Sequence, residues 1–461
     1  MCALSVQELL QSLSDIVGRE SASARIEERI LASYDGTRRS ALPEIVAFPH
    51  TAEEISRVLK LANREKTPVY PRGAASGLTG GAVPVAGGIA LDLQRMNRIL
   101  EVDADNQVAT VEPGVTVSDF QAEAQRRGLF YPPDPASADF STLGGNVAEC
   151  AGGLRAVKYG VTRDYVTGLE VVLPQGDIIH VGARTLKCVT GYDLTRLFVG
   201  SEGTLGIFTK IHLRLIPLPA ARRTLLAVFE SPEAAATAST RVLQAGILPA
   251  ALEFIDDATI ECIRKKQPLD IPAAARGALI IELDGDESSC VSGIKIIEGV
   301  LAKNGALETR RADTPADRTR LWAFRKAASP ALFAAFPNKL NEDICVLPSR
   351  TSEMLRRTRA IAAKYGVLIA NYGHIGEGNL HVNIMYPHGE KAHADAEAAS
   401  AEVMKAALEL GGTLSGEHGI GLTKLEFLPL EVAPVELALM RSIKKLLDPN
   451  NILNPGKIFA S

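Results

Sequence analysis

The sequence has 461 residues, which is too long for one hydrophobic core, so two or more domains are expected. Hydrophobic residues make up 46% and charged residues 23%, as in ordinary globular proteins, and a net charge of −4 with no basic run argues against nucleic acid as a partner. No apolar run approaches the roughly 20 residues that are needed to cross a bilayer.

The cysteines are scattered along the chain without any C-x-x-C pair. This pattern argues against iron–sulfur clusters, zinc knuckles and a disulfide framework, and it favours small reduced core residues. The N-terminal residues lack the basic and apolar segments of a signal peptide, so a cytoplasmic protein is expected, with peripheral attachment to a membrane left open. The cysteines are Cys2, Cys150, Cys188, Cys262, Cys290 and Cys345.

The first part of the chain is predicted to alternate between short helices and strands. Apolar residues at helical spacing predict a helical lead-in within residues 1–40, and Thr51 with Glu54 predicts a capping box before a helix over 52–62. The remaining predicted elements are strands at 67–70, 89–93, 107–112 and 210–216, a helix at 117–127, and a hairpin over 167–181 that turns at Gln175 and Gly176.

Residues 69–81 form a glycine-rich loop between two of these strands. Its glycines allow positive φ and close approach of a ligand, so backbone N–H groups can converge on a phosphate. The loop is neither a P-loop nor a Rossmann motif, because no Gly-Lys-Ser/Thr follows it and it leads into a strand instead of a helix. A plain surface loop is the alternative interpretation.

Further proline- and glycine-rich stretches follow at 131–135, 141–146 and 151–153. Together with the first loop they resemble the FAD-binding domain of the vanillyl-alcohol oxidase (PCMH-type) flavoproteins. The resemblance implies a non-covalently held FAD, with the pyrophosphate in the first loop and the ribityl chain and flavin beside the later stretches. It assigns cofactor contacts to Pro71, Arg72, Gly73, Ala74, Ala75, Ser76, Gly77, Leu78, Thr79, Gly80, Pro133, Asp134, Ser137, Thr142, Gly144, Gly145, Asn146, Ala151, Gly152, Gly153, Gly203, Ile207 and Asn454.

The proline cluster at 217–219 is predicted to end the first domain. Beyond it, strands and helices alternate in an order typical of an antiparallel α+β fold of ferredoxin-like type, with helices on one face of the sheet. The predicted fold is thus α+β: a PCMH-type FAD-binding domain over 1–219, a ferredoxin-like substrate domain over 220–430, and a segment 431–461 that returns to the flavin domain.

Residues 371–386 and 413–421 bring histidines and a glutamate into glycine-rich turns. His381 and Asn383 lie two apart on a predicted strand, so they share a polar face. Two imidazoles and a carboxylate on converging loops form an open site for a divalent metal, and a hydrogen-bonded polar cluster without an ion is the alternative. The later motifs resemble the branch of the family that contains the glycolate oxidase flavin subunit and the FAD-linked D-lactate and D-2-hydroxyglutarate dehydrogenases. This resemblance implies that His374, His381 and Glu417 bind the metal and that His418 is the catalytic base. The expected metal is zinc, with manganese or iron as alternatives.

An acid substrate also needs a cation, and the segment 321–329 resembles the family segment whose arginine clamps the substrate carboxylate. Arg325 is the residue at that position, and an exposed helical arginine without a substrate role is the alternative. Asn383 is a further catalytic candidate. Lys339 is a weaker candidate for a substrate contact. The predicted function is oxidation of a D-2-hydroxy acid to the 2-oxo acid. Electrons must then leave to an external acceptor (an electron-transfer flavoprotein, an iron–sulfur subunit, a cytochrome or a quinone), because no cluster motif is present, and a homodimer is one expected assembly.

Two other functions stay open at this point. One is a flavin-dependent transferase similar to alkylglycerone-phosphate synthase, which would need no metal and no net oxidation. The other is a non-catalytic flavin subunit of a larger oxidase, which the presence of all four metal and base residues disfavours.

Overall fold

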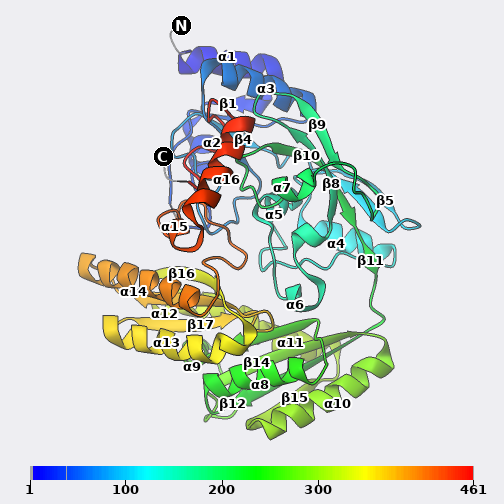
Figure 1. Ribbon diagram of the computed structural model, residues 1–461, viewed down its shortest axis with the longest axis vertical. Helices are drawn as coiled ribbons and strands as arrows, with labels where there is room; N and C mark the ends of the chain where they lie inside the picture. The colour runs from blue at the N-terminus through cyan, green and yellow to red at the C-terminus, as the bar shows by residue number, and fades with distance from the viewer. Residues whose placement is uncertain (1–3, 38, 460–461) are drawn as a thin grey trace. The chain divides into compact units, whose positions relative to one another are not determined.

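The structure, a computed structural model, describes residues 4–37 and 39–459, so Cys2 lies outside the described residues. The chain folds into two units (Figure 1). Unit 1 contains residues 1–151, 161–218 and 417–461, and unit 2 contains residues 152–160 and 219–416. The domain boundaries expected from the sequence, at residues 219 and 430, stay a prediction. Within the described ranges, no helix is both long and apolar enough to cross a membrane.

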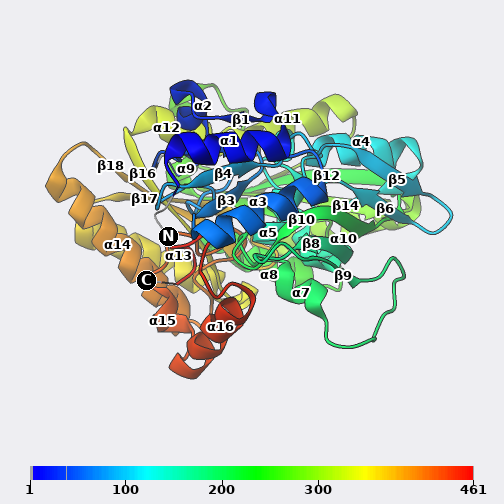
Figure 2. The same ribbon diagram turned by 90° about the horizontal axis from the view of Figure 1, so that it is seen from above.

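Unit 1 begins with a small sheet that is covered by two helices. The strand order is β1 (Ala22–Ser23), β2 (Ile45–Ala47), β4 (Ile89–Asp92) and β3 (Val69–Arg72), with β2, β4 and β3 parallel. Helices α1 (Val6–Val17) and α3 (Ala52–Glu65) bury their apolar sides with this sheet in one core, and α2 (Ile26–Leu31) follows β1. Figure 2 shows α1 and α3 beside β3 and β4. The predicted lead-in helix is confirmed.

The helix cap before α3 differs from the predicted capping box. Thr51 does cap the helix, because its hydroxyl accepts a hydrogen bond from the N–H of Glu54 at 3.1 Å. The Glu54 carboxylate, however, accepts from the N–H of His50 at 2.6 Å instead of from that of Thr51. The contact of the Glu54 side chain is thus shifted by one residue, from Thr51 to His50. It still satisfies a backbone N–H group that precedes the helix.

The glycine loop is the connection between the parallel strands β3 and β4. Parallel neighbours need a long crossover, which is commonly a helix. Here residues 73–88 make that crossover as an irregular loop. The C-terminal tail lies at the same place, since Leu453 forms a bridge with Val69 and the N–H of Asn454 donates to the carbonyl of Val69 at 2.8 Å.

A second, antiparallel sheet completes unit 1, in the order β5 (Ile99–Asp103), β6 (Val108–Val111), β10 (Ile207–Arg214), β8 (Val166–Val172) and β9 (Ile178–Gly182). The predicted hairpin is confirmed as the pair β8 and β9, with Gly176 at a φ of 89°. The loop from β9 to α7 extends away from the sheet (Figure 2). The other elements are α4 (Val117–Arg126), β7 (Leu129–Phe130), α5 (Leu143–Glu149), α7 (Leu194–Phe198), β11 (Ile216–Pro217), α15 (Leu428–Glu431) and α16 (Pro434–Leu447).

Unit 2 is built on one seven-stranded antiparallel sheet. Its order is β15 (Ala306–Ala312), β12 (Ala221–Phe229), β14 (Gly277–Gly285), β13 (Ala251–Ile255), β17 (Leu368–Gly373), β18 (Asn379–Tyr386) and β16 (Asn338–Cys345). The first four strands, with α8 (Pro232–Gln244) and α10 (Glu287–Lys303), follow the predicted ferredoxin-like order, and the α+β class is confirmed.

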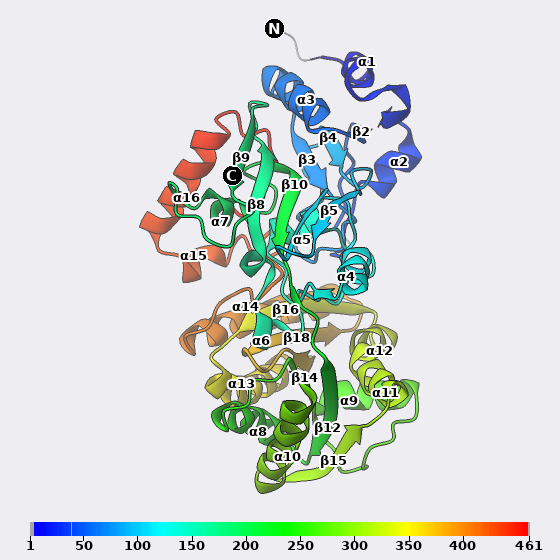
Figure 3. The ribbon, with the colours of Figure 1, turned by 90° about the vertical axis from the view of Figure 1, so that its right-hand side faces the viewer.

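Helices cover both faces of this sheet, so the prediction of a single covered face is wrong. One core joins the sheet to α8, α10, α13 (Thr351–Tyr365) and α14 (Glu390–Glu409). A second core joins the opposite face to α9 (Asp257–Lys266), α11 (Pro315–Lys326) and α12 (Ala328–Ala335). Figure 3 shows α11 and α12 on one side of the sheet and α8, α10 and α13 on the other. The short helix α6 (Ala156–Tyr159) also belongs to unit 2.

Candidate functional site

The glycine loop of unit 1 is closed against the start of α5. A Cβ added to Gly73 would overlap the hydroxyl of Thr142, and this hydroxyl also caps α5 by accepting from the N–H of Gly145 at 3.3 Å. Ala75 and Gly80 have φ values of 52° and 81°, which turn the backbone N–H groups of the loop in the manner of an anion-binding nest. The loop and the cap thus form one close-packed cradle with little room for side chains.

Several polar side chains around this cradle are buried without a protein partner. Among the described residues of unit 1, no hydrogen bond is made by Oγ1 of Thr79, Oγ of Ser141, Nδ2 of Asn146 or Oγ of Ser201. Unpaired buried polar atoms cost about 1–3 kcal/mol each, so such a group favours a polar ligand. The atoms fit the phosphate and ribityl oxygens of FAD. Ser201 was missed from sequence, whereas Ser141 begins the predicted stretch 141–146 without having been assigned as a contact.

The other predicted cofactor residues are placed as follows. Pro71 and Arg72 end β3, Pro133, Asp134 and Ser137 lie in the loop between β7 and α5, and Ile207 starts β10. The side chain of Arg72 donates to the carbonyl of Ala32 at 2.6 Å, so it is engaged with protein. Asn454 donates to the carbonyl of Gly81 at 3.1 Å, which ties the tail to the glycine loop. Gly152 and Gly153 fall in unit 2, and the FAD contacts of all these residues stay predictions.

In unit 2, the polar residues of the predicted site share one sheet face. Strand pairing sets Tyr372 opposite His381 and Ala370 opposite Asn383, and both Ala370 and Tyr372 pack in the core with α9, α11 and α12. The alternate residues Leu380, Val382 and Ile384 pack in the core on the other face. The predicted alternation of β18 is therefore confirmed, and it places His381 and Asn383 toward the face that α11 covers.

Glu253 of β13 connects two predicted site residues, and it was missed from sequence. Its Oε1 lies 2.5 Å from Nδ1 of His374, and its Oε2 accepts from Nε of Arg325 at 2.6 Å. Burial alone would raise the pKa of this carboxyl, but the charges and hydrogen bonds of His374 and Arg325 lower it to about 2. The contact assigns a proton to Nδ1 of His374, so in the neutral imidazole the lone pair is on Nε2, as in a histidine that binds a metal.

Arg325 is oriented by a carboxylate and an aromatic ring. Its guanidinium carbon lies 4.6 Å from the centre of the Tyr372 ring, in addition to the Nε contact with Glu253. Among the described residues, its two terminal amino groups make no hydrogen bond. A guanidinium fixed in this way presents two parallel donors, which is the geometry that binds a carboxylate. Lys339, on β16, contacts Ser329 at 3.4 Å and lies 4.1 Å from the Phe333 ring.

The second imidazole stands close to the first. The ring centres of His374 and His381 are 5.2 Å apart, and Nδ1 of His381 lies 3.9 Å from Oδ1 of the fully buried Asp343. Asn383 is also fully buried, and its amide donates to the carbonyls of Ala370 and His381. Asn383 therefore braces two strands, and its catalytic role stays a prediction.

The remaining predicted residues, Glu417 and His418, lie in unit 1. Oε1 of Glu417 is 4.0 Å from Nε2 of His418, and both side chains are largely buried. They begin a loop whose next residues, Ile420 and Gly421, contact the buried Glu202. The metal ligand set of His374, His381 and Glu417 and the role of His418 as base stay predictions.

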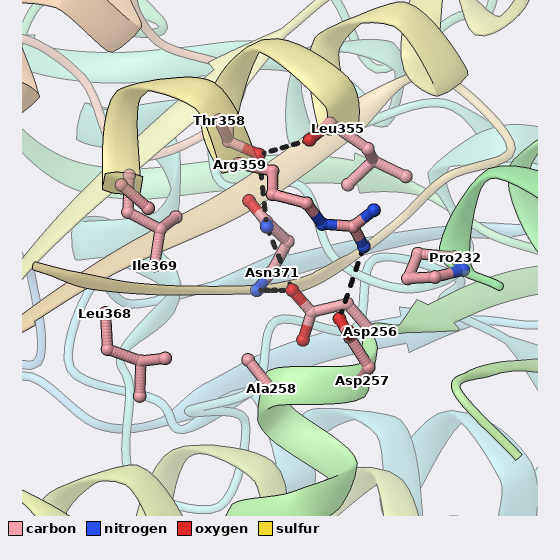
Figure 4. Close-up of a pocket in the computed structure, with 11 residues that line it drawn as sticks. Pro232, Asp256, Asp257, Ala258, Leu355, Thr358, Arg359, Leu368, Ile369 and Asn371 are labelled. Carbon is pink, nitrogen blue, oxygen red and sulfur yellow. Dashed lines mark hydrogen bonds and ion pairs between the residues drawn. The ribbon is translucent and has the colours of Figure 1, made fainter. Parts of the chain in front are cut away.

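A separate hollow of about 160 Å³ in unit 2 lies beside α9 and α13 (Figure 4). None of the predicted site residues lines it. Its floor is the carboxylate of Asp256, which accepts from the N–H and the side-chain amide of Asn371 at 2.6 and 2.9 Å. Burial raises the pKa of Asp256 to about 6, although the hydrogen bonds from Asn371 act to lower it. This network fixes the part of β17 that precedes His374.

Two family models match the chain. One, described as an FAD binding domain, matches residues 43–182, and one described as the C-terminal domain of FAD linked oxidases matches residues 218–458.

Curated relatives match almost the whole length. The "Glycolate oxidase subunit GlcD" of Bacillus subtilis is 41% identical over 98% of this chain and 97% of its own, and the "D-lactate dehydrogenase" of Anaerostipes hadrus is 39% identical over 91% and 90%. Among solved structures, p-cresol methylhydroxylase has a TM-score of 0.81 at 19% identity over 98% and 97% of the two chains. An alkyldihydroxyacetonephosphate synthase has a TM-score of 0.78 at 19% identity over 99% and 88%, so both structures share the fold alone.

Proposed function

Because the chain belongs to the family of FAD-linked oxidases, we propose that it is a dehydrogenase that oxidises a D-2-hydroxy acid such as D-lactate, glycolate or D-2-hydroxyglutarate to the 2-oxo acid. The observation that carries the proposal is the buried Glu253, which holds both Arg325 and His374. This arrangement prepares a carboxylate-binding guanidinium next to a pair of imidazoles, and a 2-hydroxy acid carries its hydroxyl one carbon from its carboxylate.

Each residue then has a defined task. The terminal amino groups of Arg325 bind the substrate carboxylate, and Tyr372 and Glu253 keep the guanidinium in place. His418 accepts the proton of the substrate hydroxyl. Bound FAD supplies the acceptor for the hydride of C2.

A divalent metal is part of the proposal. His374, His381 and Glu417 would hold it, and the proton assigned to Nδ1 of His374 by Glu253 suits a histidine ligand. Nitrogen and carboxylate donors favour zinc, with manganese and iron as alternatives. A metal at these ligands would supply Lewis acidity that lowers the pKa of the substrate hydroxyl.

The electrons leave to an external acceptor, because the sequence has no motif for a cluster or haem. An electron-transfer flavoprotein, an iron–sulfur subunit, a cytochrome or a quinone would serve. A cytoplasmic location, with or without peripheral attachment to a membrane, and a homodimer complete the proposal.

The test is an anaerobic absorbance titration of the purified holoprotein with paired D- and L-2-hydroxy acids, before and after treatment with a chelator. We expect D-isomers or glycolate to bleach the flavin, and the chelator to slow bleaching. Flavin that stays oxidised with every acid would refute the dehydrogenase and favour the transferase. Unchanged bleaching after complete metal removal would instead refute the metal alone.

A further inference from the structure

Two carboxyl groups of unit 1 have no task in the proposed reaction: Glu202 is buried, and Glu149 is half-buried with its Oε2 atom buried. Glu149 ends α5, and Glu202 lies in the turn after α7 with a φ of 51°. Glu149 lies next to both Gly81 of the glycine loop and Gly419, and Glu202 contacts the loop that begins with Glu417 and His418. Buried carboxyl groups are rare unless they are paired or hydrogen-bonded, so each needs a physical reason.

Glu202 holds the backbone of the His418 loop. Its two carboxylate oxygens accept from the N–H groups of Ile420 and Gly421 at 2.8 and 2.7 Å. A carboxylate that accepts two adjacent N–H groups is a bidentate, charge-assisted clamp. The clamp closes two residues after His418, so it fixes the direction in which that imidazole leaves the backbone.

Glu149 lies next to this clamp but is bonded differently. Its Oε2 is buried and makes no hydrogen bond among the described residues. A Cβ added to Gly419 would lie 2.7 Å from this oxygen and 2.9 Å from Oε1 of Glu202, so the two carboxyl groups face each other across Gly419. Two ionised carboxylates at such range repel each other in a buried place.

The surrounding charged groups shift the pKa of Glu149 and the pKa of Glu202 by different amounts. Asp35, Lys424 and Lys457 are the other ionisable groups that act on it. Burial raises the pKa of Glu149 well above its ordinary value, Glu202 and Asp35 raise it further, and Lys457 opposes them. Burial also raises the pKa of Glu202, but the N–H groups of Ile420 and Gly421 and the two lysines lower it.

The same loop is joined to the glycine loop. The N–H of Leu422 donates to the carbonyl of Thr79 at 2.6 Å, and a Cβ on Gly421 would overlap that carbonyl. A Cβ on Gly81 would lie 2.9 Å from Oε1 of Glu149. A change in the clamp therefore acts on the predicted phosphate loop as well as on His418.

We propose that Glu202 is a positioning residue that, as the carboxylate, holds the His418 loop against the glycine loop, and that Glu149 is the protonated member of the pair. The role of His418 as base rests on the proposed function, whereas the clamp itself does not. Gly419 is required in this arrangement, because any side chain would enter the space between the two carboxyl groups, and its φ of 87° also favours glycine.

The test compares two isosteric variants of the holoprotein, Glu202→Gln and Glu149→Gln. Glutamine resembles a protonated carboxyl group, so Glu149→Gln should leave flavin reduction by the acid within about twofold of wild type. Glu202→Gln keeps one acceptor oxygen for two N–H donors. Amide hydrogen exchange in the peptide that contains 420–421 should become about tenfold faster, the value of one lost hydrogen bond. Flavin reduction should slow by about 10- to 100-fold, as expected for a misplaced catalytic group.

Wild-type exchange at 420–421 in Glu202→Gln would overturn the clamp, and a loss in Glu149→Gln equal to that in Glu202→Gln would overturn the assignment of the proton. If Glu202→Gln does not fold, Glu202→Asp keeps the charge with a shorter reach, and it too must speed exchange at both amides or the clamp is refuted. Exchange needs no substrate. The clamp is thus judged even if no acid bleaches the flavin, an outcome that would refute the proposed function alone.

Discussion

Replacing Glu253 with glutamine tests whether this carboxylate holds the site together. The side chain is 1% exposed and accepts from both His374 and Arg325. Hydrogen bonds to charged groups contribute about 1.5–3 kcal/mol each, and breaking a buried ion pair costs about 3–5 kcal/mol. Glutamine keeps one acceptor oxygen, so Glu253→Gln should lower the free energy of unfolding of unit 2 by about 3 kcal/mol. The acid should also bind more weakly, because Arg325 loses its fixed partner.

The assay is urea unfolding followed by tryptophan fluorescence. Trp322 is the only tryptophan in the sequence, and it lies on α11, so the signal reports unit 2. With a slope of about 2–3 kcal/mol/M, the midpoint should fall by about 1 M urea. Glu282→Gln is the matched control. Glu282 is also buried, and the donors to it among the described residues are the neutral side chains of Thr224 and Trp322, which predicts a loss of about 1 kcal/mol. Equal shifts in the two variants would refute the reasoning, since the positive partners of Glu253 would then contribute nothing.

Three further predictions follow from the site and from the cysteines. His418→Asn should keep FAD and metal while flavin reduction slows by about 10²–10⁴-fold in stopped-flow absorbance, the usual contribution of positioned proton transfer, and near-normal reduction would exclude His418 as the base. Gly73→Ala should reduce FAD retention after gel filtration, because its Cβ would overlap a neighbouring side chain, whereas Gly299→Ala in α10, with no atom within 4 Å, should retain FAD like wild type. Iodoacetamide at pH 8 should label the exposed Cys188 well before Cys345, whose pKa burial raises to about 11, so that the rate at Cys345 should grow about tenfold per pH unit up to that value; equal rates at pH 8 would contradict this burial.

Local patterns were sufficient for the elements but not for the contacts between them. The alternation in β18 correctly placed His381 on the face opposite Leu380 and Val382, because strand geometry depends only on neighbours in sequence. Glu253 could not be identified in the same way, since it sits in the apolar run of β13 and its partners lie 72 and 121 residues further along the chain. The covering of the second sheet face was missed for a related reason. Helices α11 and α12 are recognisable as helices, but which face they cover depends on long-range packing.

Because Val69 pairs with Leu453, unit 1 can be completed only after the C-terminal tail has been synthesised. A ribosome releases residues 1–151 and 161–218 of unit 1 early, then residues 219–416 of unit 2, and only afterwards the tail that borders β3. Because domains fold as units during synthesis, unit 2 has its complete main segment before unit 1 has its own. During synthesis the glycine loop therefore lacks its hydrogen-bonding partners, and is accessible to chaperones and proteases, until residues 420–422 and 452–454 leave the ribosome. Premature termination after residue 416 would release a chain that keeps its complete second unit but lacks the strand partner of β3.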